Sequence, residues 1–191
     1  MLDQVFTDPW FWAFLAAVGW ALAFAVTGTK TPGRSLGFGI FMFILAEIPR
    51  VILPLPFVEQ PRITSGGPWP AIVGGLILAA SVVFGTPVLR IVPLTAPDHH
   101  EPLRTNGLYA VVRHPRMLCD ILWPLGWSMI FGSIIGVGLT AVWLLVIGAL
   151  THVEEESLVR EYGVAYRDFQ ALVPRLLHRR PSRAAKGAAS H

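Results

Sequence analysis

Charged residues are scarce in this chain. Only 14% of its 191 residues are Asp, Glu, Lys or Arg, whereas 53% are hydrophobic and seven are Trp. A soluble domain carries about a quarter charged residues, so the composition argues against a water-soluble protein with an oily core. We therefore expect an all-α integral membrane protein.

Cysteine is nearly absent as well. Cys119 is the only one, which excludes an internal disulfide and a cysteine metal cluster. Asp98, His99 and His100 are metal-ligand types, but no further ligands follow at a matching spacing, so we expect a solvated loop and no metal. The N-terminus lacks the basic region and cleavage site of a signal peptide, so we expect the first apolar block to be a retained span.

What the chain has in quantity is long apolar blocks. They run over Trp10–Thr27, Leu36–Phe57, Trp69–Val92 and Leu118–Leu150. Each of the first three fits the roughly 20 residues that one membrane span needs. The fourth, at about 33 residues, is long enough for two short crossings that turn at Gly132-Ser133. The sequence thus predicts about five transmembrane helices, the last two forming a helical hairpin.

The basic residues support an odd number of spans. Five spans place Arg104, Arg113 and Arg116 on the same side as the Arg-rich C-terminal tail, while Arg62 lies on the other. By the positive-inside rule, the C-terminus is then cytoplasmic. We expect an integral protein of a bacterial cell membrane, whose basic residues meet anionic headgroups and no nucleic acid.

Three regions follow from this reading. We expect a three-span membrane region over residues 1–100, a region with the hairpin over 101–176, and a basic flexible tail over 177–191.

The first polar segment precedes the hairpin. Asn106-Gly107 signals a turn, and Pro115 suits the first turn of a helix, where its missing N–H costs nothing. Arg113, His114 and Arg116 then lie where the chain meets lipid headgroups. An alternative is that the arginines only reach phosphates and His114 only caps the helix.

The second polar segment follows the hairpin. Glu154, Glu155 and Glu156 are expected to open a new amphipathic helix on the cytoplasmic side. Acidic residues in a first turn favour the helix dipole, which is the simple structural explanation. Three adjacent glutamates beside many arginines also suggest that at least one faces inward, toward a cation or a bound ligand.

A third candidate lies inside the second apolar block. Glu47 and Arg50 are three residues apart and are expected to pair on one helix face. Intramembrane ion pairs usually face the bundle or a cavity. With Asp120 and His152, which lie near span ends, they are candidates for a substrate cavity. The alternative is a purely structural pair.

Taken together, the two polar segments resemble the isoprenylcysteine carboxyl methyltransferase and phospholipid methyltransferase superfamily. The resemblance covers roughly Leu103 to Leu176. It rests on Gly107-Leu108-Tyr109, Arg113-His114-Pro115, Glu154-Glu155-x-x-Leu158, Tyr162-Gly163, Tyr166 and Val173-Pro174.

The resemblance implies S-adenosylmethionine bound at the cytoplasmic membrane face. It implies a methyltransferase that acts on a lipophilic small molecule or lipid by N-, O- or S-methylation, with the substrate entering from the bilayer. It assigns no catalytic residue and no metal. The cofactor-binding residues it implies are Leu103, Arg104, Tyr109, Arg113, His114, Pro115, Met117 and Glu154.

The chain departs from the superfamily pattern in three places. Met117 replaces a tyrosine, and Cys119 replaces a small residue two positions further on. Leu150 stands where the isoprenylcysteine branch has a substrate-binding arginine. These departures argue against a prenylcysteine carboxylate and favour a neutral amine, thiol or hydroxyl on a lipid-like molecule.

Two other functions remain open at this point. A sterol-type membrane reductase using NADPH shares the surroundings of Arg-His-Pro and often has an acidic residue where Asp120 stands. A non-catalytic membrane protein of the same fold is the other alternative.

Overall fold

The computed structural model describes residues 2–27, 36–64, 67–91 and 103–176. Within these ranges it is all-helical and has no strand, as predicted. The Asp98–His100 cluster and the tail over 177–191 lie outside the described residues. The elements are α1 (Leu2–Thr7), α2 (Pro9–Thr27), α3 (Leu36–Ile52), α4 (Trp69–Ile91), the 3₁₀ turn η1 (Gly107–Ala110), α5 (Pro115–Ile130), α6 (Ile134–Tyr162) and α7 (Val164–Leu172).

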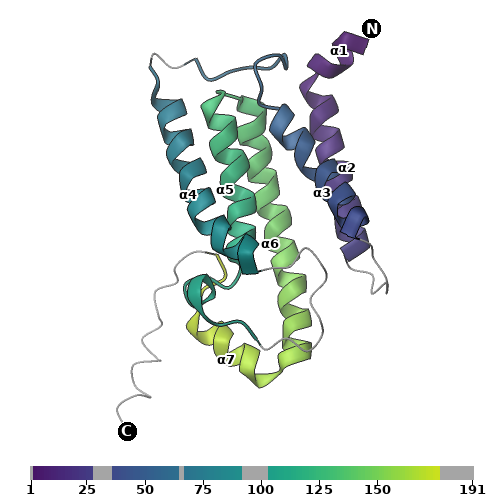
Figure 1. Cartoon of the computed structure of the whole chain (residues 1–191). Helices are drawn as coiled ribbons and strands as arrows, with labels where there is room; N and C mark the ends of the chain where they lie inside the picture. The colour runs from purple at the N-terminus through teal and green to yellow at the C-terminus, as the bar shows by residue number, and fades with distance from the viewer. Residues whose placement is uncertain (1, 28–35, 65–66, 92–102, 177–191) are drawn as a thin grey trace.

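The long helices form two groups (Figure 1). Helices α4, α5 and α6 lie side by side, with α5 packed against both neighbours. Helices α2 and α3 pack on each other as a separate pair, which meets the first group mainly where α3 contacts α5. Helix α7 and η1 lie beyond the start of α5 and beside the last turns of α6, at the end of the bundle opposite the α5–α6 turn.

The predicted hairpin is confirmed. Helix α5 ends at Ile130, α6 begins at Ile134, and Gly132 turns the chain with a φ of 62°. This left-handed conformation is easy for glycine and costly for other residues. The Ser133 Oγ accepts a hydrogen bond from the Gly136 N–H at 2.9 Å and caps α6.

Arg62 fastens this turn to the segment between α3 and α4. Its guanidinium donates to the carbonyl of Phe131 at 2.8 Å and to those of Leu55 (2.7 Å), Val58 (3.0 Å) and Pro54 (3.1 Å). A planar guanidinium with several donors can satisfy that many acceptors at once, which an ammonium cannot do in one plane. One side chain thus ties the N-terminal half of the chain to the hairpin.

Two expected helix boundaries are wrong. The second apolar block was expected to extend to Phe57, but α3 ends at Ile52. Pro54 and Pro56 follow closely, and each removes a helical N–H and disfavours the helical conformation of the residue before it. The glutamates were expected to open a new helix, but α6 runs through them to Tyr162. No glycine or proline interrupts that stretch, and the break comes only at Gly163, whose φ is 57°.

The helix beyond that break is amphipathic, but it begins at Val164 and not, as expected, at the glutamates. In α7 the side chains of Tyr166 and Phe169 are buried, whereas Val164 and Leu172 are exposed. The buried pair forms a core with Val173, against which the partly buried Leu103, Tyr109, Leu158, Val159 and Tyr162 pack.

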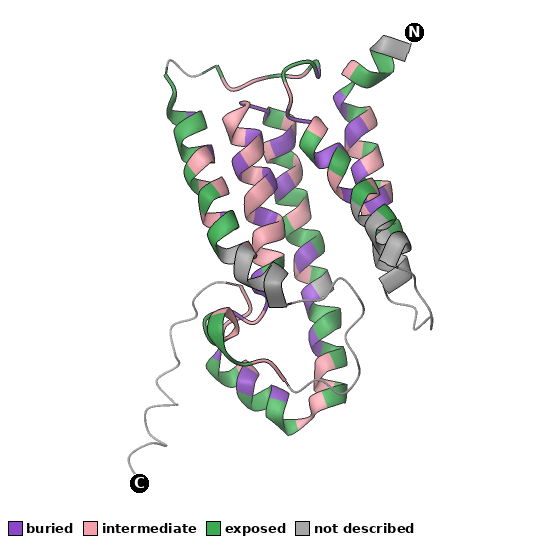
Figure 2. Ribbon diagram, in the orientation of Figure 1, coloured by how far each residue is buried: buried purple, intermediate pink, exposed green. Residues whose placement is uncertain are grey.

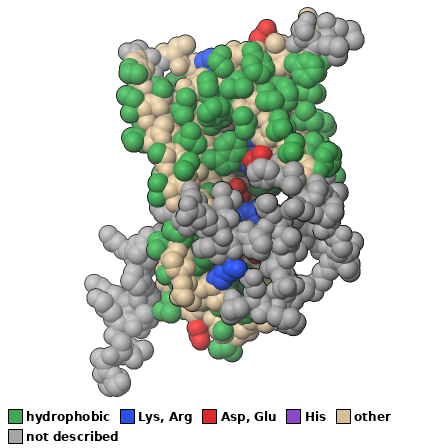
Figure 3. Space-filling model, in the orientation of Figure 1, with side chains coloured by type: hydrophobic (Ala, Val, Ile, Leu, Met, Phe, Trp, Pro, Cys, Tyr) green, Lys and Arg blue, Asp and Glu red, His purple; other side chains and the backbone are tan. Residues whose placement is uncertain are grey.

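Helix α6 is the one helix among the described residues that is long and apolar enough to cross a membrane, judged by length and composition. Pro9–Leu22 and Trp69–Val83 are shorter apolar stretches, and the count of five spans stays a prediction. The outward faces of the long helices are nonetheless exposed and apolar (Figures 2 and 3). A continuous surface of this kind would be unfavourable in water and suits a lipid environment.

Helices α4 and α5 approach so closely at one point that only glycine fits. A Cβ on Gly74 would lie 2.6 Å from the Gly126 carbonyl oxygen and 2.7 Å from the Ile130 nitrogen. A Cβ on Gly126 would lie 2.7 Å from the Gly74 carbonyl oxygen. Small residues that let helix backbones touch are typical of helix association in membranes.

Gly74→Ala should therefore destabilise the protein, and Gly75→Ala should not. The two residues are neighbours on α4, but a Cβ on Gly75 meets nothing within 4 Å. Overpacking against backbone costs about 1–3 kcal/mol, so the first variant should lose several degrees in melting temperature. Thermal unfolding of both variants in the same detergent checks this, and equal melting temperatures would contradict the packing described.

Candidate functional site

The polar residues of the two predicted segments meet at one end of the bundle, where α5 begins and α6 extends beyond its apolar part. His114 precedes α5 with a φ of −122° and a ψ of 65°, and Pro115 is the first helical residue. The ring of a proline keeps the preceding residue out of the helical conformation. The Arg-His-Pro sequence thus fixes the helix start and turns His114 toward α6.

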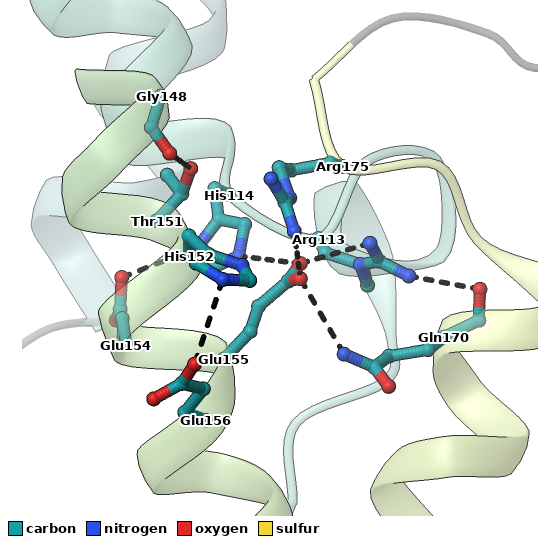
Figure 4. Close-up of polar contacts among 10 residues, drawn as sticks. All are labelled: Arg113, His114, Gly148, Thr151, His152, Glu154, Glu155, Glu156, Gln170 and Arg175. Atoms are coloured by element: carbon teal, nitrogen blue, oxygen red, sulfur yellow. Dashed lines mark hydrogen bonds and ion pairs between the residues drawn. The ribbon is translucent and has the colours of Figure 1, made fainter. Parts of the chain in front are cut away.

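His114 lies between two carboxylates (Figure 4). Its Nδ1 is 3.3 Å from Glu154 Oε2, and its Nε2 is 3.2 Å from Glu155 Oε1. The imidazole is buried, with 5% of the side chain exposed. The structure therefore brings together the two polar segments, which the resemblance placed in one cofactor pocket.

Glu155 is the inward-facing glutamate of the three. Its carboxylate accepts contacts from Arg113 Nη2 at 2.8 Å, from His114, from Arg175 Nη2 and, at 3.4 Å, from Gln170 Nε2. Burial works against ionisation, but the Arg175 hydrogen bond and the Arg113 charge outweigh it and hold the pKa of Glu155 below its usual value. Glu155 is thus an ionised internal anchor that joins α5, α6 and the segment after α7.

The segment after α7 completes this arrangement. The Arg113 N–H donates to the Pro174 carbonyl at 2.9 Å, and the His114 N–H donates to the Arg175 carbonyl at 3.2 Å. The Arg113 Nη1 also donates to the Gln170 carbonyl at 2.8 Å. The Val173-Pro174 motif therefore serves to bring a backbone strap across the start of α5.

Glu154 differs from Glu155 in being half-exposed. Its side chain is 48% exposed and its Oε2 contacts His114. Tyr109 lies within reach of its charge: burial raises the pKa of Tyr109, the positive charge of Arg104 lowers it and the Glu154 charge raises it. An accessible carboxylate beside a phenol, with its orientation fixed by a buried histidine, is a suitable arrangement for a polar ligand.

Two buried polar atoms at this site have no hydrogen-bond partner among the described residues. They are the Tyr166 hydroxyl and the Arg113 Nε. Burial and the negative charge of Glu155 raise the pKa of Tyr166 to about 12, so the phenol keeps its proton. A buried group left without a partner costs free energy, so each of these atoms has capacity for a bond to a ligand.

The remaining residues implied by the resemblance surround this centre. Leu103 packs on the Tyr166 core, and Arg104 is half-buried. Pro115 is fully buried and Met117 is half-buried in the first turn of α5. The side chain of Leu150 is outside the described part of the chain.

The third candidate group, around Glu47 and Arg50, lies between α3 and α5. Arg50 Nη1 contacts Glu47 Oε1 at 3.0 Å, which confirms the predicted pair, and its Nη2 donates to the Asp120 carbonyl at 2.7 Å. Pro124 explains this acceptor, because the N–H that would bond to the Asp120 carbonyl in an ordinary helix is missing at proline. The guanidinium also lies 5.0–5.4 Å from the ring centroids of Trp20, Trp123 and Trp143.

His152 does not belong with that group. Its side chain is 65% exposed, and its Nε2 lies 3.5 Å from Glu156 Oε1. It lines a hollow of about 370 Å³ with Glu155, Arg160 and Arg175 among others. Placing His152 in one cavity with Arg50 is therefore wrong: the two sit in separate hollows.

The sequence reasoning did not identify several residues of the site. Arg175 and Gln170 hold Glu155, and the only available signal was the Val173-Pro174 motif beside Arg175. Trp20 and Trp143 surround Arg50, and nothing in their spacing from Arg50 marked them.

Comparison with known proteins gives a family match for the segment that holds most of this site. Residues 71–165 match the family model described as phospholipid methyltransferase, a segment that runs from α4 to the first residues of α7. No curated protein and no solved structure matches the chain. The matched segment contains His114, Glu154 and Glu155, and the chain belongs to the phospholipid methyltransferase family.

Proposed function

We propose that this protein is a membrane-embedded methyltransferase that uses S-adenosylmethionine to methylate a lipophilic small molecule or lipid. The observation that carries the proposal is the placement of His114 between Glu154 and Glu155. This contact joins the two family segments at the end of an apolar hairpin, where a water-soluble donor and a lipid-soluble acceptor can meet.

The residues present fit the cofactor. S-adenosylmethionine carries an ammonium group, a carboxylate, a ribose diol and a sulfonium. Glu154 Oε2 contacts His114, which leaves Oε1 to accept from the ammonium or the ribose hydroxyls. The partnerless Tyr166 hydroxyl and Arg113 Nε offer donors to the carboxylate or the adenine edge. Leu103, Arg104, Tyr109, Pro115 and Met117 would form the remaining walls.

The bound cofactor supplies a methyl group on a positively charged sulfur. Transfer of that group is an in-line displacement, so the task of the protein is to align the reactants and exclude water. The rigid contacts of His114 with two glutamates orient Glu154, and the strap of Pro174 and Arg175 closes the site from one side. No side chain is assigned the role of a general base.

The apolar surroundings of the hairpin support a lipophilic methyl acceptor. The site lies at the end of α6 whose preceding turns are apolar, and Arg104, Arg113, Arg116 and Arg175 cluster at that end. By the positive-inside rule this end faces the cytoplasm. A neutral amine, thiol or hydroxyl on a lipid-like molecule remains the proposed acceptor.

Thermal unfolding with each candidate cofactor tests the reaction class. The purified protein in detergent should be stabilised by S-adenosylmethionine and not by NADPH. A ligand at a hundred times its dissociation constant adds about 2.7 kcal/mol of stability. Radiolabelled methyl transfer into membrane lipid extracts should then mark a lipid-soluble product. Stabilisation by NADPH instead would assign a reductase, and stabilisation by neither would reject both enzymes.

Glu154→Gln should weaken binding of S-adenosylmethionine while the protein stays folded. The loss of one charged hydrogen-bond acceptor costs about 1.5–3 kcal/mol, so affinity should fall about tenfold to hundredfold. Glu156→Gln is the matched control, since Glu156 is also exposed but pairs with His152 and Arg160, away from His114. Calorimetric titration of both variants measures the difference. Equal affinities would remove Glu154 from the cofactor site.

Glu155→Gln should instead act on stability. The variant removes the ion-pair partner of Arg113, whose side chain is 11% exposed, and of Arg175, whose side chain is 37% exposed, so the free energy of unfolding should fall by about 1.5–3 kcal/mol near neutral pH. The pKa of Glu155 is lowered on folding, so its contribution is present above the unfolded value of 4.5 and is lost as the pH falls through the lower folded value.

The free energy of unfolding should therefore fall more between about pH 6 and pH 3 in the wild type than in Glu155→Gln. Glu156→Gln again serves as the control and should follow the wild type. Parallel pH profiles for wild type and Glu155→Gln would show that Glu155 is not the ionised anchor described.

A further inference from the structure

A cavity of about 440 Å³ lies between the α2–α3 pair and the α5–α6 hairpin. Its wall is almost entirely apolar and includes four alanines of α2 together with Leu139, Val142 and Val146 of α6. The volume falls in the range of small-molecule sites. The polar side chains at its wall are few, and the one charged group is Arg50.

Arg50 is held in a fixed position by its surroundings. Only 5% of the residue is exposed, and its two terminal nitrogens are taken by Glu47 and by the Asp120 carbonyl. The rings of Trp20 and Trp143 lie at 5.4 Å and 5.2 Å from the guanidinium and also line the cavity. The cavity thus has one preorganised cationic and aromatic end.

Two hydrogen-bond donors at that end lack a partner among the described residues. They are the Arg50 Nε and the Trp20 Nε1, both buried. Buried donors in native proteins almost always have a partner, so two donors without one at the same place indicate a site where an acceptor can bind. Both unsatisfied atoms are donors, so the group that would satisfy them is an acceptor.

The charge balance restricts that acceptor further. Glu47 contacts Arg50 Nη1 with both carboxylate oxygens, at 3.0 Å and 3.1 Å, so the cation is already neutralised. A second anion would be repelled by Glu47 and would pay its own cost of desolvation. A neutral oxygen, as in a hydroxyl, carbonyl or ether, can accept hydrogen bonds from the Arg50 Nε and the Trp20 Nε1 without this repulsion or this desolvation cost.

The cavity also stands in a fixed relation to the site of His114. On α6 its wall extends from Gly136 to Ala149, and Glu154 follows on the same helix. On α5 the Asp120 carbonyl, which Arg50 holds, is six residues after His114, or about 9 Å at the rise of a helix. A molecule in the cavity would therefore have its Arg50 end directed toward the polar site.

We propose that this cavity binds the lipophilic substrate, and that the substrate class is a neutral lipophile whose oxygen accepts hydrogen bonds from Arg50 and Trp20. That the bound molecule is the substrate rests on the proposed function, whereas the binding of a neutral lipophile in this cavity does not. The hydrocarbon part fills the space between α2 and α6, and the oxygen is a recognition group at the end nearest His114.

Quenching of tryptophan fluorescence by bromine-labelled probes tests the proposal on the full chain in lipid nanodiscs. The probes are 11-bromo-1-undecanol, 1-bromoundecane and 11-bromoundecanoate. The alcohol should give saturable quenching at about tenfold lower concentration than the alkane, the value of one hydrogen bond made to a charged group. The carboxylate should bind no better than the alkane. Equal quenching by alcohol and alkane, or tightest binding of the carboxylate, would overturn the proposal.

Two neighbouring variants on α6 locate the binding. Val146 lines the cavity, whereas Leu145 is 76% exposed and does not. Val146→Phe should fill the space and abolish the saturable quenching by the alcohol, and Leu145→Phe should leave it within about twofold of wild type. The double variant Glu47→Gln/Arg50→Gln, which removes both members of the ion pair together, should remove the preference for alcohol over alkane. A preference unchanged in Val146→Phe or in the double variant would place the binding elsewhere.

Binding of the cofactor distinguishes a wrong assignment of the cavity from a wrong reaction class. Titration with S-adenosylmethionine in the same nanodiscs reports on the His114 site, and Val146→Phe should leave that affinity unchanged. Binding of the cofactor without selective binding of the alcohol would reject the cavity alone. Selective binding of the alcohol without binding of the cofactor would retain the cavity as a lipophile site and reject the methyltransferase.

Discussion

The ionised carboxylate of Glu155 is the interaction on which the site depends. A buried charge is tolerated only when partners surround it. Here they come from two separate stretches: Arg113 and His114 before α5, and Gln170 and Arg175 around the end of α7. An apolar cluster also bridges these stretches, because Leu103 and Tyr109 precede α5 and Leu158 and Val159 belong to α6. The apolar cluster of Tyr166, Phe169 and Val173 supports α7, but the register of the strap against α5 is set by the charged group and the backbone hydrogen bonds beside it.

This division of work explains why two adjacent glutamates have different roles. Successive residues on a helix point about 100° apart, so Glu155 faces the strap while Glu154 faces the half-open side with His114 between them. The histidine couples them: any shift of the anchor moves the imidazole, and with it the carboxylate available to a ligand. The buried anchor and the carboxylate that we propose to bind the cofactor are thus adjacent in the chain.

The sequence was sufficient for the features that depend on local chemistry. Apolar length and the Gly132-Ser133 pair predicted the hairpin, Pro115 predicted the start of α5, and the spacing of Glu47 and Arg50 predicted their pairing. The sequence did not predict a helix boundary where no residue marked it, or a contact between residues far apart in the chain. The glutamates looked like a helix start because acidic residues favour one, but nothing before them stops α6, and only Gly163 does. The partners of Glu155 and the tryptophans around Arg50 come from other helices, so no spacing rule relates them.

The unbroken length of α6 has a consequence of its own. Its 29 residues extend about 44 Å at the rise of an α-helix, well beyond a hydrocarbon core of about 30 Å. Where such a rod crosses a bilayer, its last turns must project past the acyl chains into the headgroup layer. Helix α6 then extends from the hydrocarbon core, where the cavity wall lies, into the hydrated headgroup layer, where Glu154 lies. Under the proposed function, a polar reagent and a lipid-soluble one meet along this helix while each stays in its own phase.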